Sequence, residues 1–434
     1  MPSFLFGLGS LLLLWFIARR WLGPQQALLA ITLLALSPPH IWYSYENKVN
    51  MMLLLLTVYA VWLYWRASET RLLRDWFVAT IVLIVAMYTH AYAVPVAAAI
   101  FFWLVWRTRS ERSLIKPIFV SGLIIALVIA PLVLFKFGQS DELTRGYLRQ
   151  LSLVELYKLL LIWLPSGNTL RTVSPHGSLA TLFRQPWPYF LIEAFFAFLL
   201  LRGLLVIGRK ARGDGWLTPV TNPASTEPAR LVLLWITMPL VLTVAGSIVT
   251  ESFYIERNLL VILPPFILLL AAGIDMSAPQ WVRLSVITGL VALSIAATVS
   301  LRFFKTEMWT VYKYKPDWRS AAYYFSDEIK SNGKLLVFFT NPTYEFTYYH
   351  RRIMLEEAPS GKKQEPSTGN ACNDEPKIIL QRIARKNWSS FYLLHNKTWS
   401  DCWDTVWESF STAPQLELIE QRDFKGLTVY KFSL

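Results

Sequence analysis

Residues 116–136 read KPIFVSGLIIALVIAPLVLFK, an apolar stretch bounded by two lysines. About 20 apolar residues in a row are enough for a helix to cross the hydrocarbon core of a bilayer. Similar stretches recur along the first 300 residues, so the sequence predicts a polytopic α-helical membrane protein with about ten transmembrane helices. The predicted spans are 3–18, 25–43, 49–65, 76–90, 92–106, 116–136, 186–207, 230–250, 255–273 and 281–301.

The composition agrees with a membrane protein. Hydrophobic residues make up 54% of the chain and charged residues only 16%, whereas a soluble domain is about a quarter charged. Mean hydropathy is +0.38. The net charge of +13 does not point to nucleic acid, because the basic residues sit in short loops between apolar stretches instead of forming one patch. We therefore expect membrane lipids as partners, and no nucleic acid.

The positions of Lys and Arg predict the orientation of the helices. Basic residues concentrate in alternate loops, which the positive-inside rule places in the cytoplasm. These loops contain Arg19–Arg20, Arg66–Arg74, Arg107–Lys116 and Arg209–Arg212. Everything after about residue 302 is then predicted to lie outside the cytoplasm.

The first predicted helix runs from outside to inside, because Arg19 and Arg20 follow it and no basic residue precedes it. A helix in this direction normally follows one that has crossed outward. We therefore expect a preceding helix and external loop that this sequence does not include. The alternative is a protein whose N-terminus lies outside.

Two domains are predicted: a transmembrane domain at 1–304 and an extracytoplasmic α/β domain at 305–434. The long external loop at 137–185 includes a segment, 151–164, with the pattern of an amphipathic helix on the outer membrane surface, or of a lid over a site. Its predicted apolar face consists of Leu153, Leu156, Tyr157, Leu160 and Leu164. Residues 213–229, rich in Pro, Gly and small polar residues, are predicted to be a flexible cytoplasmic loop.

The C-terminal domain alternates strand-like and helix-like segments, which predicts a small three-layer α/β fold. The expected strands are 335–340, 389–394, 416–421 and 427–432, with a helix at 318–329. The last two strands are expected to form an antiparallel pair around Lys425-Gly426. Residues 361–373 are predicted to be a polar loop.

The two cysteines, Cys372 and Cys402, both lie in the C-terminal domain. Outside the cytoplasm they could form a disulfide, and two free thiols are the alternative. No CxxC or HExxH spacing occurs, so we predict no metal site of those types.

The first candidate site motif is SPPHIWYSYENKVN at 37–50, which ends one predicted span and begins the next. Charges near the ends of membrane helices are costly and need an explanation. The Glu46 carboxylate can hold a metal ion or orient a polar acceptor, and the Lys48 ammonium can bind a phosphate. The alternative is an interfacial belt of aromatic residues with a local Glu46–Lys48 pair.

Two more motifs are predicted at the same outer face, where lipid phosphates lie. In YTHAY at 88–92, His90 can donate to a phosphate or act as a base, or can be a hydrogen-bonded structural residue. In ERNLLVILPP at 256–265, Arg257 precedes an apolar helix, where a guanidinium and helix amides suit a phosphate. A Glu256–Arg257 surface pair is the alternative there.

At these motifs the sequence resembles the GT-C superfamily of polytopic glycosyltransferases. The likeness is greatest to the bacterial branch related to protein mannosyltransferases and aminoarabinose lipid A transferase. Members commonly carry S-P-x-x-I-x-Y-S-Q-E-A-R-x-Y. Glu46 matches its acidic residue and Lys48 stands where arginine is usual, while Tyr45 replaces glutamine and Asn50 replaces tyrosine.

Three further phrases carry the resemblance. YTHAY matches a Y-x-H-Y-like turn, and ERNLLVILPP matches an R-[YN]-L-x-x-x-x-P run. KPDWR at 315–319 matches an aromatic D-W-R phrase that opens the external domain. The likeness spans nearly the whole chain, and the order and spacing of the motifs are more specific than any one of them.

The resemblance implies transfer of a sugar from a polyprenyl-phosphate-linked donor to a lipid, glycan or protein acceptor at the outer face of a bacterial inner membrane. The family's general base is usually an Asp in the first external loop. This sequence has no counterpart of that loop, so we expect no donor turnover by this chain alone. Glu46 is then the expected catalytic-site carboxylate. It would position the acceptor or bind a divalent cation, a cofactor that the sequence leaves open. The expected substrate-binding residues are Lys48, His90, Tyr92, Glu256 and Arg257.

Two other functions compete with a glycosyltransferase. A transporter or flippase of lipid-linked precursors usually shows internal repeats and broken helices at the bilayer midplane. No repeat is evident here, and the polar residues lie at the outer boundary. A non-catalytic membrane scaffold would use its external domain to bind a partner, and should tolerate substitution of Glu46 and Arg257.

Overall fold

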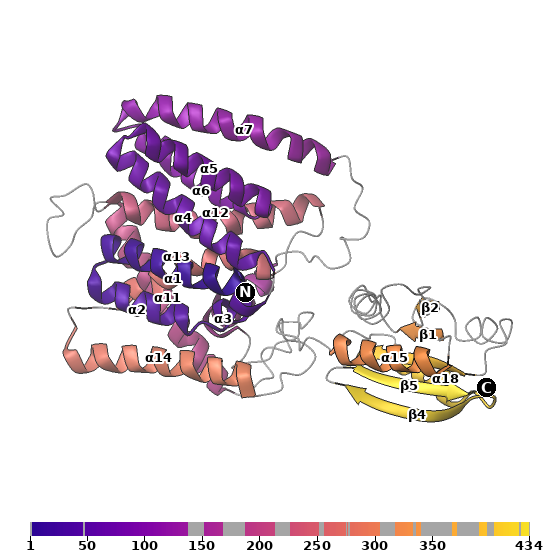
Figure 1. Cartoon of the computed structure of the whole chain (residues 1–434). Coiled ribbons are helices and arrows are strands. Elements are labelled where there is room, and N and C mark those ends of the chain that lie inside the picture. The colour runs from indigo at the N-terminus through magenta and orange to yellow at the C-terminus, as the bar shows by residue number, and fades with distance from the viewer. Residues whose placement is uncertain are drawn as a thin grey trace. The chain divides into compact units, whose positions relative to one another are not determined.

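The computed structural model describes most of the first 300 residues and the secondary structure of the C-terminal part. The described residues are 2–46, 48–137, 152–167, 187–212, 226–250, 256–274, 276, 278–303, 317–332, 336–339, 367–370, 390–396, 403–424 and 427–433. The chain forms two compact units, Met1–Val311 and Tyr312–Leu434, which we call the helical unit and the C-terminal unit (Figure 1). Cys372 and Cys402 lie outside the described residues.

The helical unit follows the predicted apolar stretches closely. Its elements in chain order are α1 (Pro2–Trp21), α2 (Pro24–Ala35), α3 (Pro38–Tyr45), α4 (Asn50–Thr70), α5 (Leu73–Thr89), α6 (Ala93–Arg107), the 3-10 turn η1 (Arg112–Leu114), α7 (Ile115–Phe137), α8 (Leu153–Tyr157), the π-helical stretch η3 (Lys158–Trp163), α9 (Leu164–Ser166), α11 (Pro188–Arg212), α12 (Thr226–Thr250), the 3-10 stretch η5 (Glu256–Ile262), α13 (Leu263–Ala272) and α14 (Gln280–Phe303).

Ten transmembrane helices are not confirmed. Among the described residues, six helices are long and apolar enough to span a membrane, and α2 with α3, bent by 56°, would make a seventh. The helices α5 and α6 have 17 and 15 residues, which at about 1.5 Å per residue falls short of a hydrocarbon core about 30 Å thick. The helix α13 has only ten residues, all of them buried.

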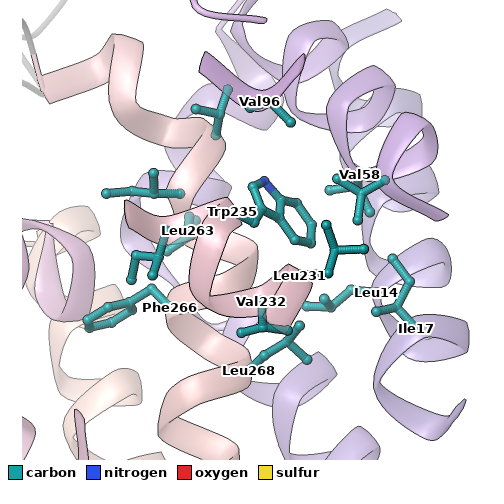
Figure 2. Packing of buried hydrophobic residues seen from close by; sticks show 14 of the residues in the cluster. Leu14, Ile17, Val58, Val96, Leu231, Val232, Trp235, Leu263, Phe266 and Leu268 are labelled. Carbon is teal, nitrogen blue, oxygen red and sulfur yellow. The ribbon is translucent and has the colours of Figure 1, made fainter. Parts of the chain in front are cut away.

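The core of the helical unit forms where helices from both ends of its sequence meet. Trp235 of α12 is fully buried, and Figure 2 shows its ring between Leu263 on one side and Val58 on the other. The backbone requires no polar side chains in this interior, because each helix satisfies its own backbone hydrogen bonds. In contrast, α7 and α14 lie at opposite edges of the unit (Figure 1), and only 28% and 17% of the residues in their apolar stretches are buried.

One end of the helical unit is tied together by ion pairs between basic loops. The buried Arg107 guanidinium pairs with Glu69 at 2.8 Å and Glu111 at 3.0 Å, and donates to Ser68 Oγ at 2.6 Å. Arg71 pairs with Glu111 at 2.8 Å. Two loops that the sequence assigns to the same side, 66–75 and 107–115, are therefore neighbours in the fold. Because α4 runs from Asn50 to Thr70, the 37–50 motif lies at the opposite end of the unit.

Two predictions about the loops of this unit need correction. The helix predicted at 151–164 is α-helical only at its two ends, because Lys158–Trp163 are π-helical. Glu155 and Lys158, which lie outside the predicted apolar face, are buried and pair with each other at 2.9 Å. Residues 226–229, predicted to be loop, form the first turn of α12.

The C-terminal unit is a five-stranded mixed sheet. Its strands are β1 (Leu336–Phe339), β2 (Ser367–Asn370), β3 (Ser390–Asn396), β4 (Glu417–Phe424) and β5 (Leu427–Ser433), in the spatial order β2-β1-β3-β5-β4. β1 pairs in parallel with β2 and β3, and β5 pairs antiparallel with β3 and β4. The predicted antiparallel pair of the last two strands is thus confirmed. The predicted polar loop at 361–373 was wrong at 367–370, which form β2.

Helices cover both faces of this sheet, which confirms the three-layer prediction. On one face, α15 (Trp318–Asn332) contributes Ala321 and Phe325 to a cluster with Val337 and Val429. On the other, α18 (Trp403–Ser411) packs its apolar side chains against the alternate strand residues. Successive side chains of a strand point to opposite faces, so each buried strand serves both clusters.

The KPDWR phrase has a structural role at its described end. The Asp317 carboxylate accepts hydrogen bonds from Ser320 N at 3.1 Å and Ser320 Oγ at 2.6 Å. This is the geometry of an N-cap, which satisfies an otherwise unpaired amide in the first turn of α15. Trp318 is buried in the core of the C-terminal unit.

Candidate functional site

The 37–50 motif forms a helix, a tight turn and the start of the next helix. Two prolines begin α3, where a missing N–H costs nothing, and Glu46 N donates to Trp42 O at 3.0 Å where the helix ends. Lys48 N then donates to Glu46 O at 2.8 Å. This turn holds the two charges of the motif close together before α4 begins.

Glu46 and Lys48 form an ion pair, as one of the sequence alternatives supposed. Lys48 Nζ lies 2.7 Å from Glu46 Oε1, and the side chains of Lys48 and Glu46 are 49% and 7% exposed. A buried carboxylate is therefore joined to a half-exposed ammonium. The pair compensates the burial of the carboxylate, and the cation remains accessible to a ligand.

Tyr43 is the point at which the first and third motifs meet. Its side chain is 2% exposed, and the charges of Glu46, Glu256 and Arg257 all act on its hydroxyl. The fold explains this, because η5, which contains Glu256 and Arg257, packs against α4. Residues about 210 positions apart in the chain are thereby brought to one site.

The YTHAY motif forms a turn between α5 and α6. His90 ends α5 with its N–H donating to Ala86 O at 3.0 Å, and its Nδ1 accepts from Tyr92 N at 3.2 Å. With Nδ1 as acceptor, the neutral ring carries its proton on Nε2, so that atom is the donor. The hydrogen bond from Tyr92 N thus fixes the orientation of the His90 ring within the turn.

Tyr92 connects the second motif to the third. It is 4% exposed, and its hydroxyl lies beside Asn258 of η5 and Thr243 of α12. Asn258 follows Arg257 directly in η5. The YTHAY turn and the ERNLL segment therefore share a contact, and all three motifs gather at one end of the helical unit.

In the third motif, Glu256 is 9% exposed whereas Arg257 is exposed. The 3-10 stretch they begin continues into α13, which starts with Leu263, Pro264 and Pro265. The guanidinium therefore precedes a run of helical turns, as the sequence predicted. Residues 251–255, the first part of this segment, lie outside the described residues.

Three buried polar atoms of the first motif have no hydrogen-bond partner within the part of the chain that the structure describes. They are Ser37 Oγ, the Tyr43 hydroxyl and Asn50 Nδ2, in side chains 3%, 2% and 6% exposed. Buried polar groups are nearly always paired, to protein, water or ligand. These three atoms therefore mark places where a polar molecule would find unused donors.

Sequence reasoning did not select Tyr43, Asn258 or Thr243 as site residues. Tyr43 and Asn258 stand inside the quoted motifs, so adjacency to Glu46 and Arg257 was the available signal. Thr243 is a lone hydroxyl in an apolar helix, where threonine usually bonds its own backbone. Nothing in the sequence distinguishes it.

The arrangement offers two cations, two carboxylates and several hydroxyl and amide donors at one membrane-helix boundary. Lys48 and Arg257 are accessible, whereas Glu46 and Glu256 are buried. Accessible cations beside buried acids suit an anionic group such as a phosphate with a neutral polar group next to it. In the described part of the chain, no three His, Cys, Asp or Glu side chains form a group that could hold a metal ion.

Comparison with solved structures identifies the class of fold. The structure is similar to that of ArnT from Cupriavidus metallidurans bound to undecaprenyl phosphate, with a TM-score of 0.52 and 11% sequence identity. The match covers 99% of this chain and 83% of that chain. The apo state of the same protein matches with a TM-score of 0.41 and 13% identity, over 99% and 82% of the two chains. The first of these likenesses shows a common fold.

The sequence adds a family match at its N-terminal end. Residues 1–135 match the family described as dolichyl-phosphate-mannose-protein mannosyltransferase. No curated protein matches the chain. This family match covers less than a third of the chain, and the likeness to ArnT is one of fold. Together with the apolar helices, they support a multi-pass membrane protein.

Proposed function

We propose that this protein is a membrane glycosyltransferase that moves a sugar from a polyprenyl-phosphate-linked donor to a lipid, glycan or protein acceptor. The observation that carries the proposal is the convergence of the three motifs around Tyr43 and Tyr92. The similar ArnT structure is bound to undecaprenyl phosphate, which supports a lipid-phosphate partner here. Because the motifs lie at the end of α4 opposite the basic loops, we place the reaction at the outer face of the membrane, a bacterial inner membrane.

The geometry suggests a role for each residue. Accessible Arg257 and Lys48 would contact the donor phosphate, with the Nε2 proton of His90 as a further donor. Buried Glu46 would act at the catalytic centre by orienting the acceptor hydroxyl. Glu256 and Tyr92 would form the walls of the substrate site.

In the proposed reaction the acceptor oxygen bonds to the anomeric carbon of the sugar as the bond from that carbon to the phosphate oxygen breaks. The polyprenyl phosphate leaves with the bonding electrons, and the acceptor proton passes to a base. Cations beside the phosphate favour this step because negative charge accumulates on the leaving group.

Binding of undecaprenyl phosphate by the full chain in lipid nanodiscs tests the proposal. We expect Arg257→Gln to weaken the Kd about ten-fold, since a charge-assisted contact contributes about 1.5 kcal/mol or more. Arg109→Gln removes an exposed arginine at the other end of the helices and should leave the Kd unchanged. Equal Kd values for Arg257→Gln and the unaltered protein would contradict the proposed phosphate site.

The Glu46→Gln variant distinguishes a glycosyltransferase from a non-catalytic membrane scaffold. Transfer is measured as release of undecaprenyl phosphate from a lipid-linked sugar donor. An enzyme should lose at least about ten-fold in rate with Glu46→Gln while staying folded, and the exposed Glu417→Gln should have no effect. Release by the unaltered protein would overturn the expectation from the sequence that this chain alone does not turn over donor, and it is the signal with which the variants are compared.

A further inference from the structure

A cavity of about 710 Å³ lies between α5 and α7, away from the candidate site. Its walls are apolar and include Phe77, Ile81, Val120 and Ile124, all of which are exposed on the outside of the helical unit. Side chains exposed on membrane helices face lipid, so the cavity opens toward the acyl chains of the bilayer. Its volume is in the range of sites that bind small hydrophobic molecules.

The polar groups at the inner wall of the cavity are occupied with one another. Thr80 and Ser121 hydrogen-bond each other, and the Tyr64 hydroxyl lies 3.3 Å and 3.1 Å from their oxygens. Thr80 also donates to Trp76 O at 2.8 Å. These hydroxyls need no ligand, so the interior presents an apolar surface to whatever occupies it.

The cavity carries three cations at the end where α5 and α7 begin: Arg71, Arg74 and Lys116. Arg71 is paired with Glu111 at 2.8 Å, and Arg74 lies 3.7 Å from Asp75, an acid it shares with Arg66. Lys116 is exposed and has no ion pair within the described part of the chain.

Positive charge therefore exceeds negative charge at the mouth of the cavity. Between residues 66 and 116 the chain has seven Arg and Lys residues but only three acidic ones. Acyl chains suit the apolar walls, and a phosphate suits the surplus of cations. Basic pockets between transmembrane helices on the cytoplasmic side are suited to anionic lipid headgroups.

We propose that this cavity binds an anionic phospholipid of the membrane leaflet on the basic-loop side. The lipid phosphate lies between Arg74 and Lys116, and its acyl chains lie against Phe77 and Ile124. This site is distinct from the candidate glycosyltransferase site and does not depend on that function. A zwitterionic phospholipid would fit the walls but would not use the surplus cations.

Native mass spectrometry of the full chain with added phosphatidylglycerol and phosphatidylcholine of matched acyl chains tests the proposal. We expect several-fold higher retention of phosphatidylglycerol. The double variant Arg74→Gln/Lys116→Gln should bring the retention ratio of the two phospholipids close to one, because each cation near the membrane surface contributes up to about 1 kcal/mol, or about five-fold. The control Arg109→Gln removes a cation of the same end that does not line the cavity, and should leave the preference unchanged.

A second variant tests the apolar walls independently of charge. Ile81→Trp fills part of the cavity and should reduce retention of both phospholipids without changing their ratio. Equal retention of the two phospholipids by the unaltered protein, or undiminished preference in the double variant, would overturn the proposal. It would also be overturned if undecaprenyl phosphate displaced phosphatidylglycerol at equal concentration, since the cavity would then belong to the carrier lipid.

Discussion

Gly203 of α11 lies where the backbone of α13 leaves no space for a side chain. A Cβ at this position would collide with the carbonyl oxygen of Leu269, and a Cβ at Gly273 would collide with the carbonyl oxygen of Leu199. Small residues permit this kind of close backbone approach between membrane helices. The two glycines therefore set the distance between α11 and the buried helix.

We expect Gly203→Ala to destabilise the helical unit by about 1–3 kcal/mol, the usual cost of overpacking, because a backbone atom cannot move aside as a side chain can. Gly208→Ala is the matched control in the same helix, since nothing lies within 4 Å of a Cβ there. It should be neutral or mildly stabilising, because alanine favours helices more than glycine does. Thermal unfolding of the detergent-solubilised protein measures both. Equal midpoints for the two variants would contradict the close contact.

At the scale of residues, the sequence identified the charged residues of the candidate site but not the side chains that surround them. Glu46, Lys48, His90 and Arg257 could be selected because charges at membrane-helix ends are costly. The burial of Tyr43 among the charges of two motifs could not be predicted, because this contact joins segments more than 200 residues apart. Burial and pairing depend on that tertiary contact, and local sequence does not encode it.

At the scale of elements, the ion pairs and hydrogen bond of Arg107 connect the end of α4 to the end of α6. Its guanidinium reaches Ser68, Glu69 and Glu111 together, which requires the planar fork of arginine. We expect Arg107→Lys to destabilise the protein by about 1–2 kcal/mol, less than for a fully buried pair because both acids are partly exposed.

The comparison for Arg107→Lys is Arg109→Lys, two residues along the same segment. The Arg109 guanidinium lies 4.1 Å from the Trp106 ring centre and is exposed, so a lysine should serve nearly as well. Thermal midpoints at low and high salt measure the difference. If both variants unfold at the same temperature, Arg107 does not fasten the two helices.

Most elements could be predicted from periodicity and turn residues, and the exceptions have physical causes. The regular α-helix assigned to 151–164 was wrong in its middle, because Lys158–Trp163 form a π-helical stretch that the apolar spacing does not reveal. β2 was missed because Ser367–Asn370 contains none of the β-branched and aromatic residues that mark strands apart from Thr368. It forms a strand by pairing with β1.

At the scale of the whole molecule, the two units have separate cores of different character, so each should respond to different conditions. The C-terminal unit contains Tyr324 and Tyr392, and burial raises the pKa of both hydroxyls. The carboxylates of Glu420 and Glu328 raise the two pKa values further. The Tyr392 hydroxyl donates to Glu328, and the Tyr324 hydroxyl donates to Glu420 at 3.1 Å.

These shifts predict that the C-terminal unit loses stability as pH rises above about 10. In the unfolded chain a tyrosine releases its proton near pH 10, whereas Tyr324 and Tyr392 keep theirs in the folded unit. The unfolded state then binds fewer protons than the folded state, so higher pH favours unfolding. Pulse proteolysis in urea across about pH 8.5 to 10.5 should show a falling midpoint for this unit.

Tyr324→Phe and Tyr392→Phe supply the control for the pH effect. Each variant should be less stable near neutral pH, where a hydrogen bond is lost, but its midpoint should fall less steeply at alkaline pH. A parallel fall in the variants and the unaltered protein would show that other groups cause the effect.

The enclosure of α13 constrains the order in which the helical unit can be assembled. All ten of its residues are buried, and its neighbours α2, α11 and α12 all precede it in the chain. During synthesis those helices enter the membrane before the helix that fills the space between them exists. Until residue 272 has left the ribosome, α2, α11 and α12 lack the helix that packs against all three of them. We therefore expect the packing of the helical unit to be completed late in synthesis, when α13 and then α14 are added.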